Sequence, residues 1–97
     1  MEKKEKRVKK FSVNWQQLTC DENGHPKLDK KFASAYGIVE SVTCLREDDC
    51  WKLSIKRNRR RLRRAFVCPQ EDLDETIVLS LTGKKVFLTP KLLFVHS

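Results

Sequence analysis

Short stretches in which apolar and polar residues alternate recur along the chain, and clusters of turn-forming residues separate them. The clearest stretch places Trp51, Leu53 and Ile55 in alternation with lysine and serine. This period of two predicts a β-strand with one buried face. Residues 37–45 are rich in β-branched side chains, which favour the same structure. The pattern therefore predicts a chain built mainly from strands.

Further strands are predicted wherever the same pattern returns, at 11–15, 61–67, 76–81, 84–88 and 92–95. Thr82 and Gly83 form a turn signal, so the strands on either side are expected to pair as a hairpin. The acidic segment 70–75 predicts at most one helical turn. Residues 27–36 fit two structures, because Leu28, Phe32 and Tyr36 have helical spacing, whereas Phe32 and Tyr36 also share the parity of the following strand. We favour an extended segment there.

Five or six short strands at spacings of about ten residues indicate an all-β fold, or β with one short helix. The strands at 36–45, 50–57, 61–67, 76–81 and 84–95, with a helical linker at 69–75, resemble the layout of the OB-fold. A glycine at position 37 would let the first of them bend. The resemblance implies a small barrel that acts as a binding module, often for single-stranded nucleic acid.

The length of 97 residues suits one domain, and 39% apolar residues suffice for one modest core. Residues 1–10 contain six basic and two acidic side chains, namely Lys3, Lys4, Lys6, Arg7, Lys9 and Lys10 against Glu2 and Glu5. This composition predicts a disordered basic tail, with the folded domain at 11–97. Neither a secretory signal nor a membrane-spanning segment is expected, since long apolar runs are lacking.

Positive charge is the strongest compositional feature, because 21 Lys and Arg against 13 Asp and Glu give a net charge of +8. Such a balance favours polyanionic partners. Seven of the nine residues at 56–64 are basic, and they fall on a predicted hairpin. Guanidinium groups bind phosphates with two hydrogen bonds and stack on bases. The predicted nucleic-acid-binding residues are Lys56, Arg57, Arg59, Arg60, Arg61, Arg63, Arg64 and, as a stacking ring, Phe66.

The basic stretch also fits a nuclear-localisation signal or a charged hairpin edge that resists strand pairing. The aromatic residues are expected mainly in the core: Phe11, Trp15, Phe32, Tyr36, Trp51, Phe87 and Phe94. Phe66 is undecided, because Ala65 and Val67 point opposite to it and only one set can face the core.

The acidic turn Glu47–Asp49 conflicts with the usual OB ligand site, because it would repel phosphates at the loop between the first two OB strands. A nucleic-acid surface would therefore be displaced from that site. The alternative is a protein-interaction barrel, whose basic segments serve nuclear import or an acidic partner and whose strand edge can pair with another chain. Nuclear localisation is expected in a eukaryote, and cytoplasmic localisation otherwise.

We expect no enzymatic activity, cofactor or metal site. The chain lacks a glycine-rich phosphate loop and the common nucleophile and metalloprotease motifs. Cys44 and Cys50 are separated by five residues, which is longer than the usual zinc-knuckle spacing. Together with Cys20 and Cys68 they are expected to be reduced thiols.

Overall fold

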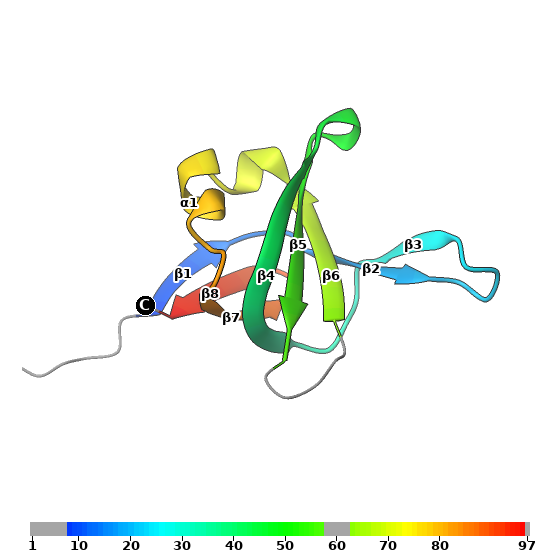
Figure 1. The fold of residues 1–97 in the computed structure, drawn as a ribbon, viewed down its shortest axis with the longest axis horizontal. Coiled ribbons are helices and arrows are strands. Elements are labelled where there is room, and N and C mark those ends of the chain that lie inside the picture. Colours follow the sequence, from blue (N-terminus) through cyan, green and yellow to red (C-terminus); the bar gives the residue numbers. More distant parts are fainter. Residues whose placement is uncertain (1–7, 58–62, 97) are drawn as a thin grey trace, which may run out of the picture.

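A computed structural model describes residues 8–57 and 63–96, which form one antiparallel sheet of eight strands (Figure 1). The strands are β1 (Val8–Ser12), β2 (Gln16–Cys20), β3 (Pro26–Asp29), β4 (Ala35–Leu45), β5 (Cys50–Lys56), β6 (Arg63–Pro69), β7 (Lys85–Thr89) and β8 (Leu92–His96). Helix α1 spans Glu75–Leu79, and 3₁₀ turns occupy Arg46–Asp48 and Gln70–Asp72. The order across the sheet is β1-β8-β7-β4-β5-β6-β2-β3.

The core lies on one face of this sheet, as the alternation in β5 predicts. Trp51, Leu53 and Ile55 are all buried, and Leu53 is fully enclosed. The indole nitrogen of Trp51 donates a hydrogen bond to the backbone oxygen of Leu73 at 3.2 Å. The burial of Trp51 on the core face is thus confirmed, and its one polar atom is satisfied there.

The chain crosses between two distant parts of the sheet within residues 13–15. Strand β1 pairs with β8, whereas β2 pairs with β6. Between them, the backbone N–H of Val13 donates to the oxygen of Lys91 at 3.1 Å, and that of Trp15 donates to the oxygen of Pro90 at 3.0 Å. Both side chains are buried. The crossing therefore anchors the turn between β7 and β8 to the core.

A mainly β fold is confirmed, but the predicted barrel of five or six strands is wrong, because the described residues form one sheet of eight strands that does not close. The additional strands come from the N-terminal part of the chain, where β2 and β3 form a hairpin that extends away from the rest of the sheet (Figure 1). The predicted strand at 11–15 ends at Ser12 because Val13 and Trp15 bond to a turn instead of a strand. The segment 27–36 is extended in β3 and again from Ala35.

The predicted strand at 76–81 is also wrong, since this region contains helix α1. Its β-branched residues favour a strand locally, but their burial follows a helical spacing, with Val78 and Leu81 in the core and Ile77 packed against it. Strand β7 consequently pairs with β4 and β8, and not with a preceding hairpin partner. Tertiary packing has overridden local propensity here.

The predicted disordered tail at 1–10 is too long, because residues 8–10 belong to β1. Val8 pairs with His96 and Lys10 with Phe94, so the backbone is ordered by its pairing with β8. The amino-acid composition did not indicate this pairing, because the side chains of residues 8–10 are all exposed. Residues 1–7 lie outside the described residues.

Gly37 lies in β4 close to the point where the pairing partner of this strand changes from β7 to β5. A Cβ atom at this position would lie 2.7 Å from the backbone oxygen of Lys56, which is closer than such atoms pack. The neighbouring Ile38 pairs with both Lys56 and Lys85, so three strands meet here. The glycine thus permits a close backbone approach at this position.

We predict that Gly37→Ala lowers the free energy of unfolding by about 1–3 kcal/mol, because the new methyl group meets backbone that cannot rotate away. Urea denaturation measures the change. Ser41→Ala, at an exposed position of the same strand, serves as the control and is expected to fall within about 0.5 kcal/mol of wild type. A Gly37→Ala protein as stable as the control would contradict this packing.

Candidate nucleic-acid interface

Charge is separated along β5 and β6. Strand β5 ends at Lys56, followed by Arg57, and Lys56 pairs with Arg63 at the start of β6. At the opposite end of the two strands, Cys50 pairs with Pro69. A backbone hydrogen bond of 2.9 Å from Gln70 to Asp49 holds two acidic segments together there. The positive end is therefore the better suited of the two to phosphate. The acidic residues around the opposite end are Glu47, Asp48, Asp49, Glu71, Asp72, Asp74 and Glu75.

Arg57 is held over an exposed aromatic ring at the positive end. Its guanidinium carbon lies 4.8 Å from the centre of the Tyr36 ring, and Nη2 donates to the Tyr36 hydroxyl at 3.0 Å. Tyr36 is 53% exposed. A planar cation stacked beside an accessible ring is the kind of surface on which nucleic-acid bases stack.

Two further predicted arginines are already engaged within the protein. The Nε atom of Arg63 donates to Oε1 of Glu40 at 2.6 Å. This hydrogen bond lowers the pKa of the Glu40 carboxyl and raises that of the Arg63 guanidinium, so both groups stay charged. Arg64 lies over the Phe66 ring at 5.4 Å, and its Nη2 donates to Gln17 at 3.4 Å. Arg59, Arg60 and Arg61 lie outside the described residues.

The assignment of Phe66 as a stacking ring must be corrected. Phe66 is fully buried, and the centre of its ring lies 5.0 Å from that of Phe32. It pairs with Leu53 across β5 and β6 and shares the core face. A base cannot reach a ring enclosed in this way, so Phe66 is a core residue and Arg64 covers it.

The outer face of the sheet carries an aromatic row whose members the sequence pattern predicts to be buried. Tyr36 on β4 lies opposite Phe87 on β7, and Phe87 lies opposite Phe94 on β8. The Phe87 and Phe94 ring centres are 5.9 Å apart. Lys10 on β1 pairs with Phe94 and lies at the end of the row. We call Tyr36, Phe87 and Phe94 the aromatic row.

A second line of residues runs beside the aromatic row and carries positive charge. Ile38 on β4 pairs with Lys85 on β7 and with Lys56 on β5, and Lys56 pairs in turn with Arg63. Lys56 and Lys85 are exposed. Alternation along β5 and β7 puts both on the outer face, since the residues adjacent to them in sequence, at 55 and 86, are buried. The aromatic row is thus bordered by two lysines and an arginine from three strands, β7, β5 and β6.

A sequence signal for the aromatic row exists, although it is ambiguous. In β7 both parities are apolar, since Val86 and Leu88 alternate with Phe87. The same holds in β8, where residues 93 and 95 alternate with residues 92 and 94. A strand that is apolar on both faces indicates either burial on both sides or an exposed apolar surface that can bind a partner. Only the pairing partners of the strand distinguish these two possibilities.

Further chemistry is sparse in the part of the chain that the structure describes. Residues 8–57 and 63–96 contain no group of three or more histidine, cysteine, aspartate or glutamate residues arranged to hold a metal ion. Within the same residues no helix has the length and apolar character needed to cross a membrane. Burial, assisted by the nearby Asp72 carboxylate, raises the pKa of the Cys68 thiol to about 12, so this thiol is a poor nucleophile.

Comparison of the chain with protein-family models, with curated proteins and with solved structures finds no match.

We predict that the cysteines differ sharply in reactivity. Cys20 and Cys44 are exposed and should be alkylated by iodoacetamide in the native protein, whereas the buried Cys68 should react only after unfolding. Mass spectrometry of proteolytic fragments after a timed reaction in mildly alkaline buffer measures each rate. Labelling of Cys68 as fast as Cys20 would contradict its burial.

Proposed function

We propose that this protein is a non-enzymatic nucleic-acid-binding module whose interface is the outer face of β4, β7, β8 and β1 together with the positive end of β5 and β6. The observation that carries the proposal is the aromatic row bordered by exposed cations. The aromatic row offers π-surface for bases, and Arg57, Lys56, Lys85 and Lys10 offer charge for phosphates. Arg59, Arg60 and Arg61 extend the same charge in the sequence.

Single-stranded DNA or RNA suits this surface better than a duplex. Bases in a duplex stack on one another and present only their edges, whereas unpaired bases can stack on side chains. Tyr36 is the member of the aromatic row with the most accessible ring, and Arg57 lies beside it. The single-stranded nucleic acid would then run across β4, β7 and β8, with its phosphates near the bordering lysines.

We also propose an OB-like relationship for residues 35–96. Helix α1 follows the third of five strands, β4, β5, β6, β7 and β8, and the fourth of these, β7, pairs with the first, β4. This layout supports a binding role, although the interface proposed here lies elsewhere than the usual OB site. The acidic Glu47–Asp49 turn gives the physical reason, since it occupies the loop between the first two strands of the five.

A protein-interaction module is the second candidate, and the sheet edges favour it. Strand β3 ends the sheet on one side, and the β2–β3 hairpin exposes Leu28 at 48%. An extended segment of another chain could pair with such an edge. Tyr36 distinguishes the two candidates. Nucleic-acid binding would use its ring for stacking, whereas a partner that pairs with the sheet edge would not contact the ring.

We predict that Tyr36→Leu weakens binding to a labelled single-stranded oligonucleotide by about 5- to 150-fold, the equivalent of about 1–3 kcal/mol for one lost stacking contact. Fluorescence anisotropy across a salt series measures the dissociation constant. Leu28→Ala is the matched control, because Leu28 has similar exposure on the distant hairpin, and it should bind as wild type does.

Either of two results would overturn the proposal. The first is wild-type protein without salt-dependent binding to any single-stranded DNA or RNA at low ionic strength, since phosphate contacts release counterions. The second is a Tyr36→Leu protein that folds and binds as tightly as the control.

We predict that Glu40→Gln tightens binding. Glu40 holds the Arg63 guanidinium at 2.6 Å, and its neutralisation makes that cation available to a phosphate. The logarithmic salt slope should steepen by about 0.7 for one added contact to a single strand. Glu47→Gln makes the same change in net charge at the acidic end and is the control. Equal effects of the two substitutions would show that only net charge matters.

A further inference from the structure

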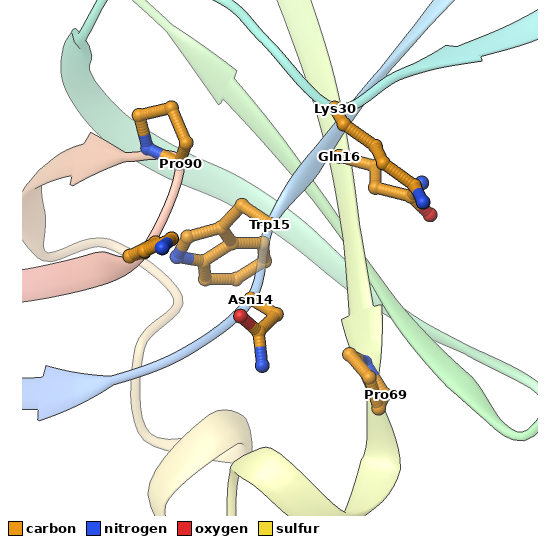
Figure 2. Close-up of a pocket in the computed structure, with 7 residues that line it drawn as sticks. Asn14, Trp15, Gln16, Lys30, Pro69 and Pro90 are labelled. Atoms are coloured by element: carbon orange, nitrogen blue, oxygen red, sulfur yellow. The ribbon is translucent and has the colours of Figure 1, made fainter.

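A cavity lies apart from the aromatic row, where residues 13–15 cross between the turn of β7–β8 and the end of β6 (Figure 2). Its volume is about 360 Å³. We call it the Trp15 pocket, and it shares no residue with the aromatic row. The lining residues are Asn14, Trp15, Gln16, Lys30, Pro69, Pro90 and Lys91.

Trp15 gives this pocket an unusual feature. Its side chain is only 2% exposed, and its backbone N–H is fixed to the oxygen of Pro90. The indole N–H, however, has no acceptor among the described residues. Figure 2 shows the indole nitrogen on the edge of the ring that faces the turn carrying Pro90. Buried polar groups are nearly always hydrogen-bonded, so this donor has unused bonding capacity beside the pocket.

The remaining polar lining also favours an acceptor with negative charge. Lys30 and Lys91 are exposed on the rim, and Gln16 provides an amide. None of the lining residues is acidic. The carboxylate of Asp72, which is not part of the lining, already accepts hydrogen bonds from the backbone nitrogen and Nδ2 of Asn14 at 2.9 and 3.3 Å. That carboxylate orders Asn14 from outside the pocket, so the charged side chains of the lining itself are the two lysines.

We propose that the Trp15 pocket binds an acidic peptide segment of a partner protein, with a carboxylate or backbone carbonyl of the peptide accepting the Trp15 indole N–H. The rings of Pro69 and Pro90 give the pocket apolar walls of the kind that hold extended peptides. Lys30 and Lys91 neutralise the acidic side chains at the rim. The site is independent of the proposed nucleic-acid interface.

A peptide fits these features better than a nucleic-acid strand. Trp15 is buried, so its ring has no accessible face on which a base could stack. The edge that carries the N–H is the part of the ring with unused bonding capacity, and an edge donor recognises a carbonyl or carboxylate. Because this N–H is shielded from solvent and faces the β7–β8 turn (Figure 2), the peptide must displace part of the rim on that side, where the long flexible side chain of Lys91 can move aside.

The test uses the two indole N–H signals in a proton–nitrogen correlation spectrum, assigned through Trp15→Phe. The probes are an oligoglutamate peptide, an oligoglutamine peptide of the same length and an oligothymidine. We expect oligoglutamate to shift the Trp15 indole proton downfield as it gains an acceptor. The Trp51 indole is an internal control and should stay unchanged, because it already donates to Leu73.

Lys30→Gln with Lys91→Gln should weaken oligoglutamate binding severalfold, whereas Lys52→Gln on β5 should leave it unchanged. These substitutions change exposed or half-exposed positions and leave the core intact. An unmoved Trp15 signal would overturn the proposal. It would also be overturned by an equal shift with oligoglutamine, which would remove the role of charge, or by a shift with oligothymidine alone, which would assign the pocket to nucleic acid.

Discussion

The architecture depends on the short crossing at residues 13–15. Two backbone hydrogen bonds, from Val13 to Lys91 and from Trp15 to Pro90, attach this crossing to the turn between β7 and β8. Because the chain reaches β8 on one side and β6 on the other, strands from both parts of the sheet enclose one core. Val13 and Trp15 are both buried in that core. The aromatic row and the Trp15 pocket both depend on the position of the β7–β8 hairpin that the crossing fixes.

Strand pairing also keeps the positive, aromatic surface apart from the acidic end of β5 and β6. Pairing of β1 with β8 brings Lys10 beside Phe94 and extends the outer face of the sheet by one strand. The close approach at Gly37 brings β5 against β4, so that Arg57 reaches the Tyr36 ring. Acidic residues collect at the opposite end of β5 and β6, where they disfavour phosphate. The positive, aromatic surface therefore has a defined place and a defined limit.

Strands with one apolar and one polar face were predictable from the sequence. Strands whose two faces are both apolar or both polar were not. The alternation around Trp51 identified β5 and its buried face, and the acidic turn that follows Leu45 marked the end of β4. In contrast, Val78 is a buried residue of helix α1, whose β-branched residues predict a strand. The sequence does not decide the face of Phe66 and wrongly predicts Phe87 in the core, because the neighbours of both are also apolar and only cross-strand pairing determines which side is enclosed. Strand β1 is mostly exposed and carries two lysines, and its pairing with β8, together with the packing of Phe11 against the core, orders it.

Chemical-shift mapping with a single-stranded oligonucleotide would locate the contacted surface without any substitution, and so tests the proposed interface itself. We expect backbone amide shifts to change along β1, β4, β7 and β8 around the aromatic row and at Lys56 and Arg57. The acidic segments at 47–49 and 71–75 should remain unchanged. Perturbations centred on the β2–β3 hairpin or on the acidic end, with the aromatic row unaffected, would contradict the proposed interface.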